Sequence, residues 1–304
     1  MRSSFNISGL VAAAALALSQ PASAISILFD YSYDSSGFFS GANASRQTLL
    51  NQAASEFTSR IQDHLTAITP SGSNSFGVSF FNPSSTSVVT LNNYSVADNA
   101  VIVYVGAQDL GSSTLGQGGP GGYSFSGSSA FANSIARGQA GALNNPATDF
   151  GPWGGSISFN SGLSNWYFGS ANPTSGNGLY DFYSVAVHEL GHLLGFGTAD
   201  SFGNLVAGSN FTGPASSTLY GGFVPLADGA HWLEGLNSTT GGVSQEVAMD
   251  PLLGTGTRMH FTELDFAALR DTGWQIAPVP VPAAVWLFAS GLIGLLAVAR
   301  RRAG

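Results

Sequence analysis

The stretch HELGHLLGFGTAD, residues 188–200, holds two histidines, a glutamate and two glycines in a tight pattern. His188 and His192 are four residues apart, so on a helix both side chains project from one face. That spacing lets two imidazoles reach one Zn²⁺ ion. Glu189 is rotated by about 100° from His188, so it would flank the metal and serve as general base toward an attacking water. The stretch therefore predicts two metal ligands and one base on a single helix.

The residues that lead into this stretch predict the helix independently. In LYDFYSVAVHELGHLL, residues 179–194, the apolar side chains fall on one helical face. They are Tyr183, Ala186, Val187, Leu190, Leu193 and Leu194. The competing interpretation is that two ordinary helix histidines fit H-E-x-x-H by chance. The metal site is favoured because the helix has its own signal, the protein is predicted to be exported, and the chain has only five histidines.

A glycine follows the second histidine closely and extends the pattern. Gly195 stands three residues after His192, and glycine can adopt the left-handed conformation that ends a helix. The longer pattern, HExxHxxG, resembles the metzincin clan of zinc peptidases. In the commonest metzincins a third histidine follows that glycine by three residues, but this position is Thr198, whose hydroxyl is a poor zinc ligand. Asp200 lies two residues out of register and is a weaker candidate.

A better candidate for the third ligand is His231, in the segment DGAHWLE at 228–234. In leishmanolysin-type metzincins an insertion separates the glycine turn from the third histidine. A tryptophan, a Met-turn and a helix ending in an LxDxGW phrase then follow. The chain has the same order: His231-Trp232, Ala248-Met249-Asp250-Pro251, and LRDTGW at 269–274. The resemblance covers residues 156–274. The competing interpretation of His231 is a surface-loop histidine beside a packed tryptophan.

The resemblance implies a role for each matching residue. His188, His192 and His231 would bind one catalytic Zn²⁺, and Glu189 would be the general base. Met249 would lie in a tight turn beneath the metal as a hydrophobic floor. Asp250 is a candidate for orienting a histidine from outside the metal's own ligand set.

Two functions from different classes fit these features. The first is an exported zinc-dependent endopeptidase that hydrolyses a protein or peptide substrate in a cleft along the strand expected at 156–160. No tyrosine follows Met249 to stabilise an oxyanion. The second is a catalytically inactive protease-fold protein that binds at the cell surface or in a biofilm matrix, which suits the Gly-, Ser- and Asn-rich loops. The intact Glu189 favours the enzyme.

Hydrophobic periodicity predicts a mixture of strands and helices, and the resemblance implies an α+β fold of the metzincin type. An N-terminal lobe, 25–195, would contain a mixed, twisted sheet with packed helices. Its elements would be a strand at 25–33, an amphipathic helix at 45–65, paired strands at 72–81 and 87–91, a buried central strand at 100–105, and an edge strand at 156–160. The glycine-dense segment 111–127 is interpreted as a long flexible loop, because a phosphate-binding loop usually has a lysine.

A smaller, irregular C-terminal lobe, 196–277, would hold the Met-turn and a final helix. Thr262 and Asp265 form a T-x-x-D start for this helix, and Gly273 fits its C-cap. The two remaining histidines are interpreted as surface or capping residues, with His64 on the amphipathic helix and His260 just before Thr262.

Both ends of the chain are typical of targeting signals. Residues 1–24 have the charge, the apolar core and the A-x-A order of a secretory signal peptide. Residues 278–304 resemble the PEP-CTERM sorting signal of Gram-negative bacteria, with VPVPAAVWLF before an apolar stretch at 283–299 and an arginine cluster. The resemblance implies an exosortase-type enzyme as partner, membrane contact only through this tail before processing, and a final location at the cell surface or outside the cell.

The composition between these ends excludes several classes of partner. Of nine basic residues, Arg2 and three tail arginines lie in the ends, which leaves five against 17 acidic residues. With no basic patch, nucleic acid and anionic membranes are poor partners. The chain has no cysteine, so packing and bound metal must stabilise the fold without disulfides.

Overall fold

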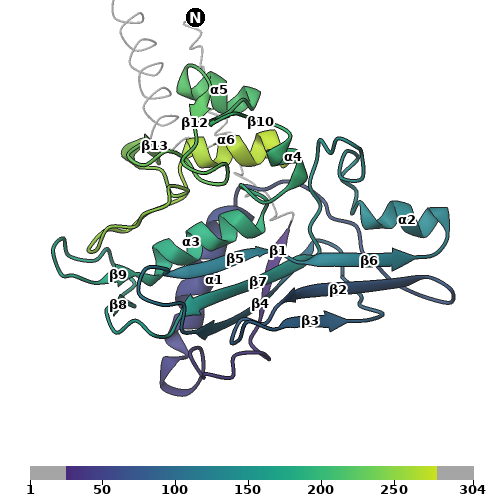
Figure 1. Ribbon diagram of the computed structural model, residues 1–304, viewed down its shortest axis with the longest axis horizontal. Helices are drawn as coiled ribbons and strands as arrows, with labels where there is room; N and C mark the ends of the chain where they lie inside the picture. Colours follow the sequence, from purple (N-terminus) through teal and green to yellow (C-terminus); the bar gives the residue numbers. More distant parts are fainter. Residues whose placement is uncertain (1–24, 279–304) are drawn as a thin grey trace, which may run out of the picture.

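The computed structural model describes residues 25–278 and confirms the α+β class (Figure 1). The main sheet has the strand order β1-β4-β7-β5. Its strands are β1 (Ser26–Asp30), β4 (Ala100–Gln108), β5 (Gly116–Pro120) and β7 (Gly154–Asn160). β1, β4 and β7 are parallel and β5 is antiparallel to β7, so the sheet is mixed as predicted. The expected central strand is confirmed, because β4 lies between β1 and β7.

Two expectations about this sheet are wrong. The segment 111–127 is not a long loop, since it forms β5 and a further strand, β6 (Gly122–Ser126). The strand at 156–160 is not an edge strand, because β5 pairs with β7 and takes the edge position itself. Sequence patterns missed β5 because GQGGP lacks the β-branched and aromatic residues that mark strands.

The glycines of β5 are explained by the helix that packs on it. This helix, α3 (Phe182–Leu193), lies across the sheet beside β5 (Figure 1). A Cβ atom on Gly116 would lie 2.7 Å from Glu189 Oε1 and 2.8 Å from Val185 Cγ1. One on Gly118 would lie 3.0 Å from Glu189 Cβ. Only glycine lets the edge strand approach α3 so closely, and this approach brings the β5 backbone beside Glu189.

A second sheet, with the order β3-β2-β6, extends the N-terminal half of the molecule. The predicted pair is confirmed: β2 (Ser75–Phe81) and β3 (Val88–Leu91) are antiparallel, and β6 pairs with the other edge of β2. Side chains of β2 pack with Tyr104 and Trp153 in a separate apolar cluster, in which the rings of Phe80 and Tyr104 stack 4.1 Å apart.

The amphipathic helix is confirmed but is shorter than expected. α1 spans Ser45–Thr58 and packs against α3 in the main core. It stops before residue 65 because the following chain pairs with the C-terminal segment: Ile61 bridges Ile276, and Gln62 N–H donates to the carbonyl of Gln275. His64 is therefore outside the helix, where it is exposed.

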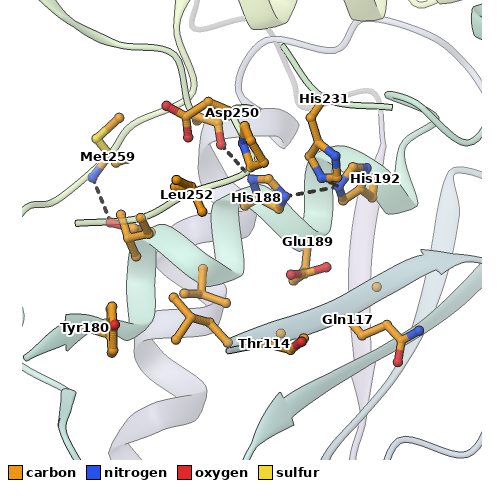
Figure 2. A pocket seen from close by; sticks show the side chains of 18 of the residues that line it. Thr114, Gln117, Tyr180, His188, Glu189, His192, His231, Asp250, Leu252 and Met259 are labelled. Atoms are coloured by element: carbon orange, nitrogen blue, oxygen red, sulfur yellow. Dashed lines mark hydrogen bonds between the residues drawn. The ribbon is translucent and has the colours of Figure 1, made fainter. Parts of the chain in front are cut away.

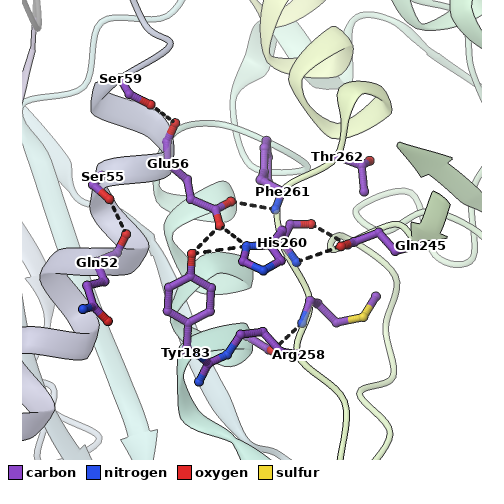
Figure 3. Close-up of polar contacts among 12 residues, drawn as sticks. Gln52, Ser55, Glu56, Ser59, Tyr183, Gln245, Arg258, His260, Phe261 and Thr262 are labelled. Carbon is purple, nitrogen blue, oxygen red and sulfur yellow. Dashed lines mark hydrogen bonds and ion pairs between the residues drawn. The ribbon is translucent and has the colours of Figure 1, made fainter. Parts of the chain in front are cut away.

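Glu56, near the end of α1, connects three parts of the fold (Figure 3). The hydroxyl of Tyr183 on α3 donates to Glu56 Oε1, and His260 Nδ1 lies 2.6 Å from the same oxygen. The backbone N–H of Phe261 donates to Glu56 Oε2 at 2.8 Å. His260 was expected to be a surface or capping residue. It is partly exposed, but it caps no helix among the described residues and contacts Glu56.

Four short elements precede α3: η1 (Gly41–Asn43), α2 (Ser129–Ile135), β8 (Trp166–Tyr167) and β9 (Tyr180–Asp181).

The elements after α3 lie on the side of this helix that faces away from the main sheet (Figure 1). They are α4 (Asp200–Gly203), β10 (Val206–Ala207), β11 (Asn210–Phe211), α5 (Pro214–Tyr220), β12 (Val224–Pro225), β13 (Asn237–Thr240), β14 (Val243–Glu246) and α6 (Glu263–Thr272). The final helix, α6, begins with the predicted capping box of Thr262 and Asp265, and Gly273 is its C-cap.

The predicted signal peptide, 1–24, lies outside the described residues. So do the apolar stretch 283–299 and all of the predicted sorting tail except Pro278. Across residues 25–278, no helix combines the length and the apolar character needed to cross a membrane.

Candidate metal centre

Helix α3 holds the first part of the site firmly in place. Its N-cap is Asp181, whose Oδ2 accepts hydrogen bonds from the N–H and the hydroxyl of Ser184 at 3.1 and 2.7 Å. Arg258 donates to both oxygens of the same carboxylate, at 2.9 and 2.8 Å. Every residue of α3 except His188 is buried. The helix that carries the histidines therefore cannot shift without breaking core packing.

The structure brings three histidines together. Figure 2 shows His188 and His192 on successive turns of α3, with His231 meeting them from the segment above. His192 Nε2 lies 3.1 Å from His188 Nε2 and 3.0 Å from His231 Nε2. The three side chains are close enough to hold one metal ion. Helix periodicity places the first two, but only the tertiary fold brings in His231.

The second nitrogen of each ring has its own partner. His188 Nδ1 lies 2.8 Å from the carbonyl of Ala248, and His192 Nδ1 lies 2.9 Å from that of Phe196. His231 Nδ1 lies 2.8 Å from Asp228 Oδ2. Partners of this kind fix the ring orientation and the tautomer of metal-binding histidines, leaving Nε2 as the free lone pair.

The carboxylate that orients a histidine is Asp228, which sequence reasoning missed; Asp250, proposed for this role, has no such contact. Figure 2 shows the Asp250 carboxylate pointing away from the imidazoles. The D-x-x-H spacing of Asp228 and His231 could have indicated this contact. An aspartate three residues before a histidine can accept its backbone N–H, as Asp228 Oδ1 does at 2.9 Å, and this brings the carboxylate beside the ring. Burial acts to raise the pKa of Asp228, but hydrogen bonds from Ala230 and His231 outweigh it and lower the pKa overall.

Residues 228–250 and α6 meet around one buried carboxylate, that of Asp265. Its Oδ1 accepts from Trp232 Nε1 at 2.9 Å, and its Oδ2 accepts from the N–H of Ala248 at 3.0 Å and of Thr262 at 2.8 Å. Asp265 therefore links Trp232, the neighbour of His231, to Ala248, the neighbour of Met249. Sequence patterns had assigned Asp265 only the helix start.

Met249 is fully buried against α3 between the two histidine turns. A Cβ atom on Gly191 would lie 2.5 Å from the sulfur of Met249, so the glycine leaves room for this side chain. Met249 also accepts a backbone hydrogen bond from Trp232 N–H at 2.9 Å. Met249 therefore packs on the helix that carries His188 and His192, and its role beneath a metal ion stays a prediction.

The glycine turn after α3 has the predicted conformation. Gly195 has φ +105°, in the left-handed region where glycine is favoured. Thr198, three residues after this glycine, donates its hydroxyl to the carbonyl of His192 at 2.5 Å. Asp200 begins α4, is exposed, and is not among the clustered residues. Neither residue competes with His231.

Glu189 lies at the floor of a cleft with the three histidines (Figure 2). The side chain is only 5% exposed, and burial raises its pKa to about 8 although the Gly118 N–H lowers it. The cavity has a volume of about 460 Å³ and runs between β5 and residues 250–253. A second hollow of about 410 Å³ shares Gln117, Gly118 and Thr198 with it and continues along β5.

The histidine cluster fits a metal cation. Burial lowers the pKa of His188 well below its usual range and that of His192 to about 4, so both imidazoles are neutral near pH 7. With Nδ1 of each ring engaged, the Nε2 lone pairs of all three face one another with no donor between them. In a tetrahedral zinc site with Zn–N bonds near 2.05 Å, ligand nitrogens lie roughly 3.3 Å apart. The observed separations of 3.0 and 3.1 Å are close to this value.

No family model matches the chain, and no curated protein or solved structure matches it. What the site can do must therefore be derived from its own residues.

Proposed function

We propose that this protein is a zinc-dependent endopeptidase, similar to the leishmanolysin-type metzincins. One observation carries the proposal: the buried carboxylate of Glu189 lies beside three converging imidazole nitrogens, at the floor of an open cleft. A structural zinc site needs a closed set of four ligands. Three protein ligands with an adjacent acid at a cleft are typical of hydrolytic zinc enzymes.

His188, His192 and His231 would hold the ion through Nε2, oriented by Ala248, Phe196 and Asp228. When bound, zinc supplies Lewis acidity, which polarises a carbonyl and lowers the pKa of water. The protein's own part is to keep the imidazoles neutral and their lone pairs aligned before any ion arrives. Such preorganisation is supported by the burial of α3 and by the Met249 packing.

Glu189 would transfer the proton during hydrolysis. Burial raises the pKa of Glu189 to about 8 in the absence of an ion, and the charge of a bound zinc ion would lower this pKa and so favour the ionised carboxylate that a general base requires. The carboxylate would accept a proton from the attacking water and pass it to the leaving amine. The Gly118 N–H holds this carboxylate from the β5 side and limits the directions in which it can rotate.

The substrate would be an extended peptide lying along β5. In the main sheet β5 pairs only with β7, so its other edge is available to a further strand. Backbone hydrogen bonds from such an edge bind a peptide without reading its side chains. The opposite wall includes Leu252 and Leu253, which would contact side chains near the cleaved bond.

The proposed site of action is outside the cytoplasm. This inference rests on the sequence patterns of residues 1–24 and 278–304, and with them the exosortase-type partner stays a prediction. Detecting the mature N-terminus at residue 25, and the presence or loss of the tail, by mass spectrometry of secreted protein would test it.

The decisive experiment combines zinc content with hydrolysis of a denatured protein such as casein, using the purified full chain. We expect about one zinc per chain, and hydrolysis that a zinc chelator abolishes. Glu189→Ala should keep zinc and lower kcat/KM by roughly 10²- to 10⁴-fold. His231→Ala should lose zinc, whereas the matched control His64→Ala, at an exposed histidine outside the site, should keep zinc and activity.

Each result has a distinct meaning. Full zinc content in His231→Ala would overturn the assignment of the third ligand. A zinc-loaded wild-type protein that hydrolyses no denatured protein would overturn the peptidase and favour the inactive binding scaffold.

A further inference from the structure

A second group of metal-ligating side chains lies outside the histidine cluster. Glu234, Glu246 and Asp250 each offer a carboxylate oxygen, and these oxygens lie within 4.8 Å of one another. They come from three places: three residues after His231, the end of β14, and the residue after Met249. The cluster thus joins the segment of the third histidine to the Met-turn.

Asp250 marks this cluster as more than an accidental grouping of surface acids. It is only 4% exposed, and its Oδ2 is buried without a hydrogen-bond partner. Its carboxylate points away from the imidazoles (Figure 2). A buried, unpartnered carboxylate oxygen is costly unless a cation or donor satisfies it.

No basic side chain among the described residues pairs with this group. The ion pairs found within residues 25–278 include none with Glu234, Glu246 or Asp250. Burial, the charges of Glu246 and Glu234, and a hydrogen bond with Glu246 raise the pKa of Asp250 to about 8. Without an added cation, the three carboxyl groups relieve their repulsion by keeping a proton on Asp250, and a bound cation would replace that proton.

We propose that Glu234, Glu246 and Asp250 bind one Ca²⁺ ion, which fastens the segment carrying His231 to the Met-turn. Calcium prefers carboxylate and carbonyl oxygens and tolerates irregular geometry, whereas magnesium demands a near-ideal octahedron. Glu234 is exposed and Glu246 half-buried, so an ion can enter from solvent and reach the buried oxygen of Asp250. The all-oxygen ligand set separates this site from the all-nitrogen histidine cluster.

The ion would add a link on the solvent side of a junction that backbone hydrogen bonds and Asp265 hold from the inside. Between Glu234 and Asp250 the chain forms the small β13–β14 hairpin, whose tip is exposed. Trp232 N–H already bonds to the Met249 carbonyl on the inner side. A cation on the outer side would bind Glu234 to Asp250 and so keep the nearby His231 in position beside α3.

The test is calcium binding by the full chain that has been stripped of metal with EGTA, freed of the chelator and reloaded with zinc, measured by titration calorimetry and thermal unfolding. We expect about one Ca²⁺ per chain with a dissociation constant of roughly 10⁻⁴ to 10⁻³ M. Saturating calcium should raise Tm by about 3 °C or more, and magnesium should do much less. Asp250→Asn and Glu234→Gln should remove both the binding and the shift. Asp200→Asn, at an exposed acid outside the cluster, should leave both unchanged.

Glu234 is exposed, so Glu234→Gln carries the test even if Asp250→Asn does not fold. The same titration with Glu189→Ala separates this site from the peptidase proposal, because calcium should bind whether or not the protein hydrolyses anything. Absence of calcium binding or of a Tm shift in the wild-type protein would overturn the proposal. So would a result in which these variants change only the preference for Lys or Arg in substrates, since the cluster would then be a subsite for basic side chains.

Discussion

His231 is the proposed ligand that depends most on its neighbours, because it lies on a segment outside regular structure. Asp228 accepts from its backbone N–H and contacts its Nδ1. The other two histidines are held by a buried helix and contact backbone carbonyls, which no side-chain substitution removes. A single acidic side chain therefore controls the orientation of the third imidazole.

We expect Asp228→Asn to weaken zinc binding about 10- to 100-fold, because an amide holds the imidazole less strongly than a carboxylate does. Competition with a chromogenic chelator measures this affinity directly. Asp200→Asn, which removes an exposed acid elsewhere, is the control and should bind zinc like the wild type. Equal affinity in Asp228→Asn would mean that the contact with Nδ1 does not position His231.

A second prediction at the scale of one residue concerns the Asp265 carboxylate. All its hydrogen-bond partners are donors, so Asp265→Asn places an amide N–H₂ against at least one buried donor. We expect the variant to lose about 1–3 kcal/mol of unfolding free energy at pH 7. Urea denaturation measures the loss. A variant as stable as the wild type would show that Asp265 does not hold the junction between Trp232 and Ala248.

The same carboxyl gives the stability a defined pH dependence. Burial raises the pKa of Asp265 from 3.8 to about 6, while its four hydrogen bonds act to lower it. Between pH 3.8 and about 6 the folded state holds a proton on Asp265 that the unfolded state has released. The contribution of this proton to the unfolding free energy is therefore complete below pH 3.8 and is lost as the pH rises through 6. It amounts to about 3 kcal/mol. The stability difference between wild type and Asp265→Asn should therefore be largest near pH 4 and shrink toward pH 7. A difference that grows with pH would contradict this.

Among the elements, strand β5 decides how the cleft is built. It provides the free edge beside Glu189, and it can approach α3 only because Gly116 and Gly118 have no side chain. Gly119, in the same strand, has open space where its Cβ would be. The strand thus contains both a critical glycine and a neutral one.

We expect Gly116→Ala to lose about 1–3 kcal/mol of unfolding free energy through overpacking, because its Cβ would press on Glu189 and Val185. Hydrolysis should fall more than stability alone explains, since the displaced atom is Glu189 Oε1. Thermal unfolding is compared with that of Gly119→Ala, which should be as stable as the wild type, and kcat/KM is compared with that of the wild type. If the two variants behave alike, β5 does not lie against Glu189 as described.

The elements differ in how far the sequence predicts them. Regular periodicity predicts α3, β2, β3 and β4. Their apolar residues either recur at the spacing of one face of the element or form a continuous run, as in buried β4. The end of α1 could not be predicted, since it is set by pairing between Ile61 and Ile276, over two hundred residues apart. β5 was missed because its glycines are required by close packing against α3 and not by strand propensity, and β6 was missed because its alternating residues, GYSFS, lie within the same glycine-dense segment. The same holds for the site: the residue types His188, Glu189 and His192 are visible in a short pattern, whereas the carbonyls of Ala248 and Phe196 have no sequence signal.

At the scale of the whole molecule, the histidine cluster joins two parts of the chain. His188 and His192 belong to α3, which packs on the main sheet, while His231 belongs to the elements on the other side of α3. The chain has no cysteine to cross-link these parts. Packing around Asp265, Glu56 and Met249 connects them, and a bound ion would add a direct bond across the junction.

Removing zinc should therefore lower the stability of the entire protein and not only its activity. At a free zinc concentration 100 times the dissociation constant, binding adds about 2.7 kcal/mol, which for a chain of this size corresponds to a Tm shift of roughly 5–11 °C. Differential scanning calorimetry with zinc and after chelation measures the shift, with calcium held constant so that the acidic cluster contributes equally. His231→Ala should show a Tm that no longer responds to zinc, and His64→Ala should respond like the wild type. A wild-type protein that binds one zinc ion yet unfolds at the same temperature without it would show that the ion does not bridge the two parts.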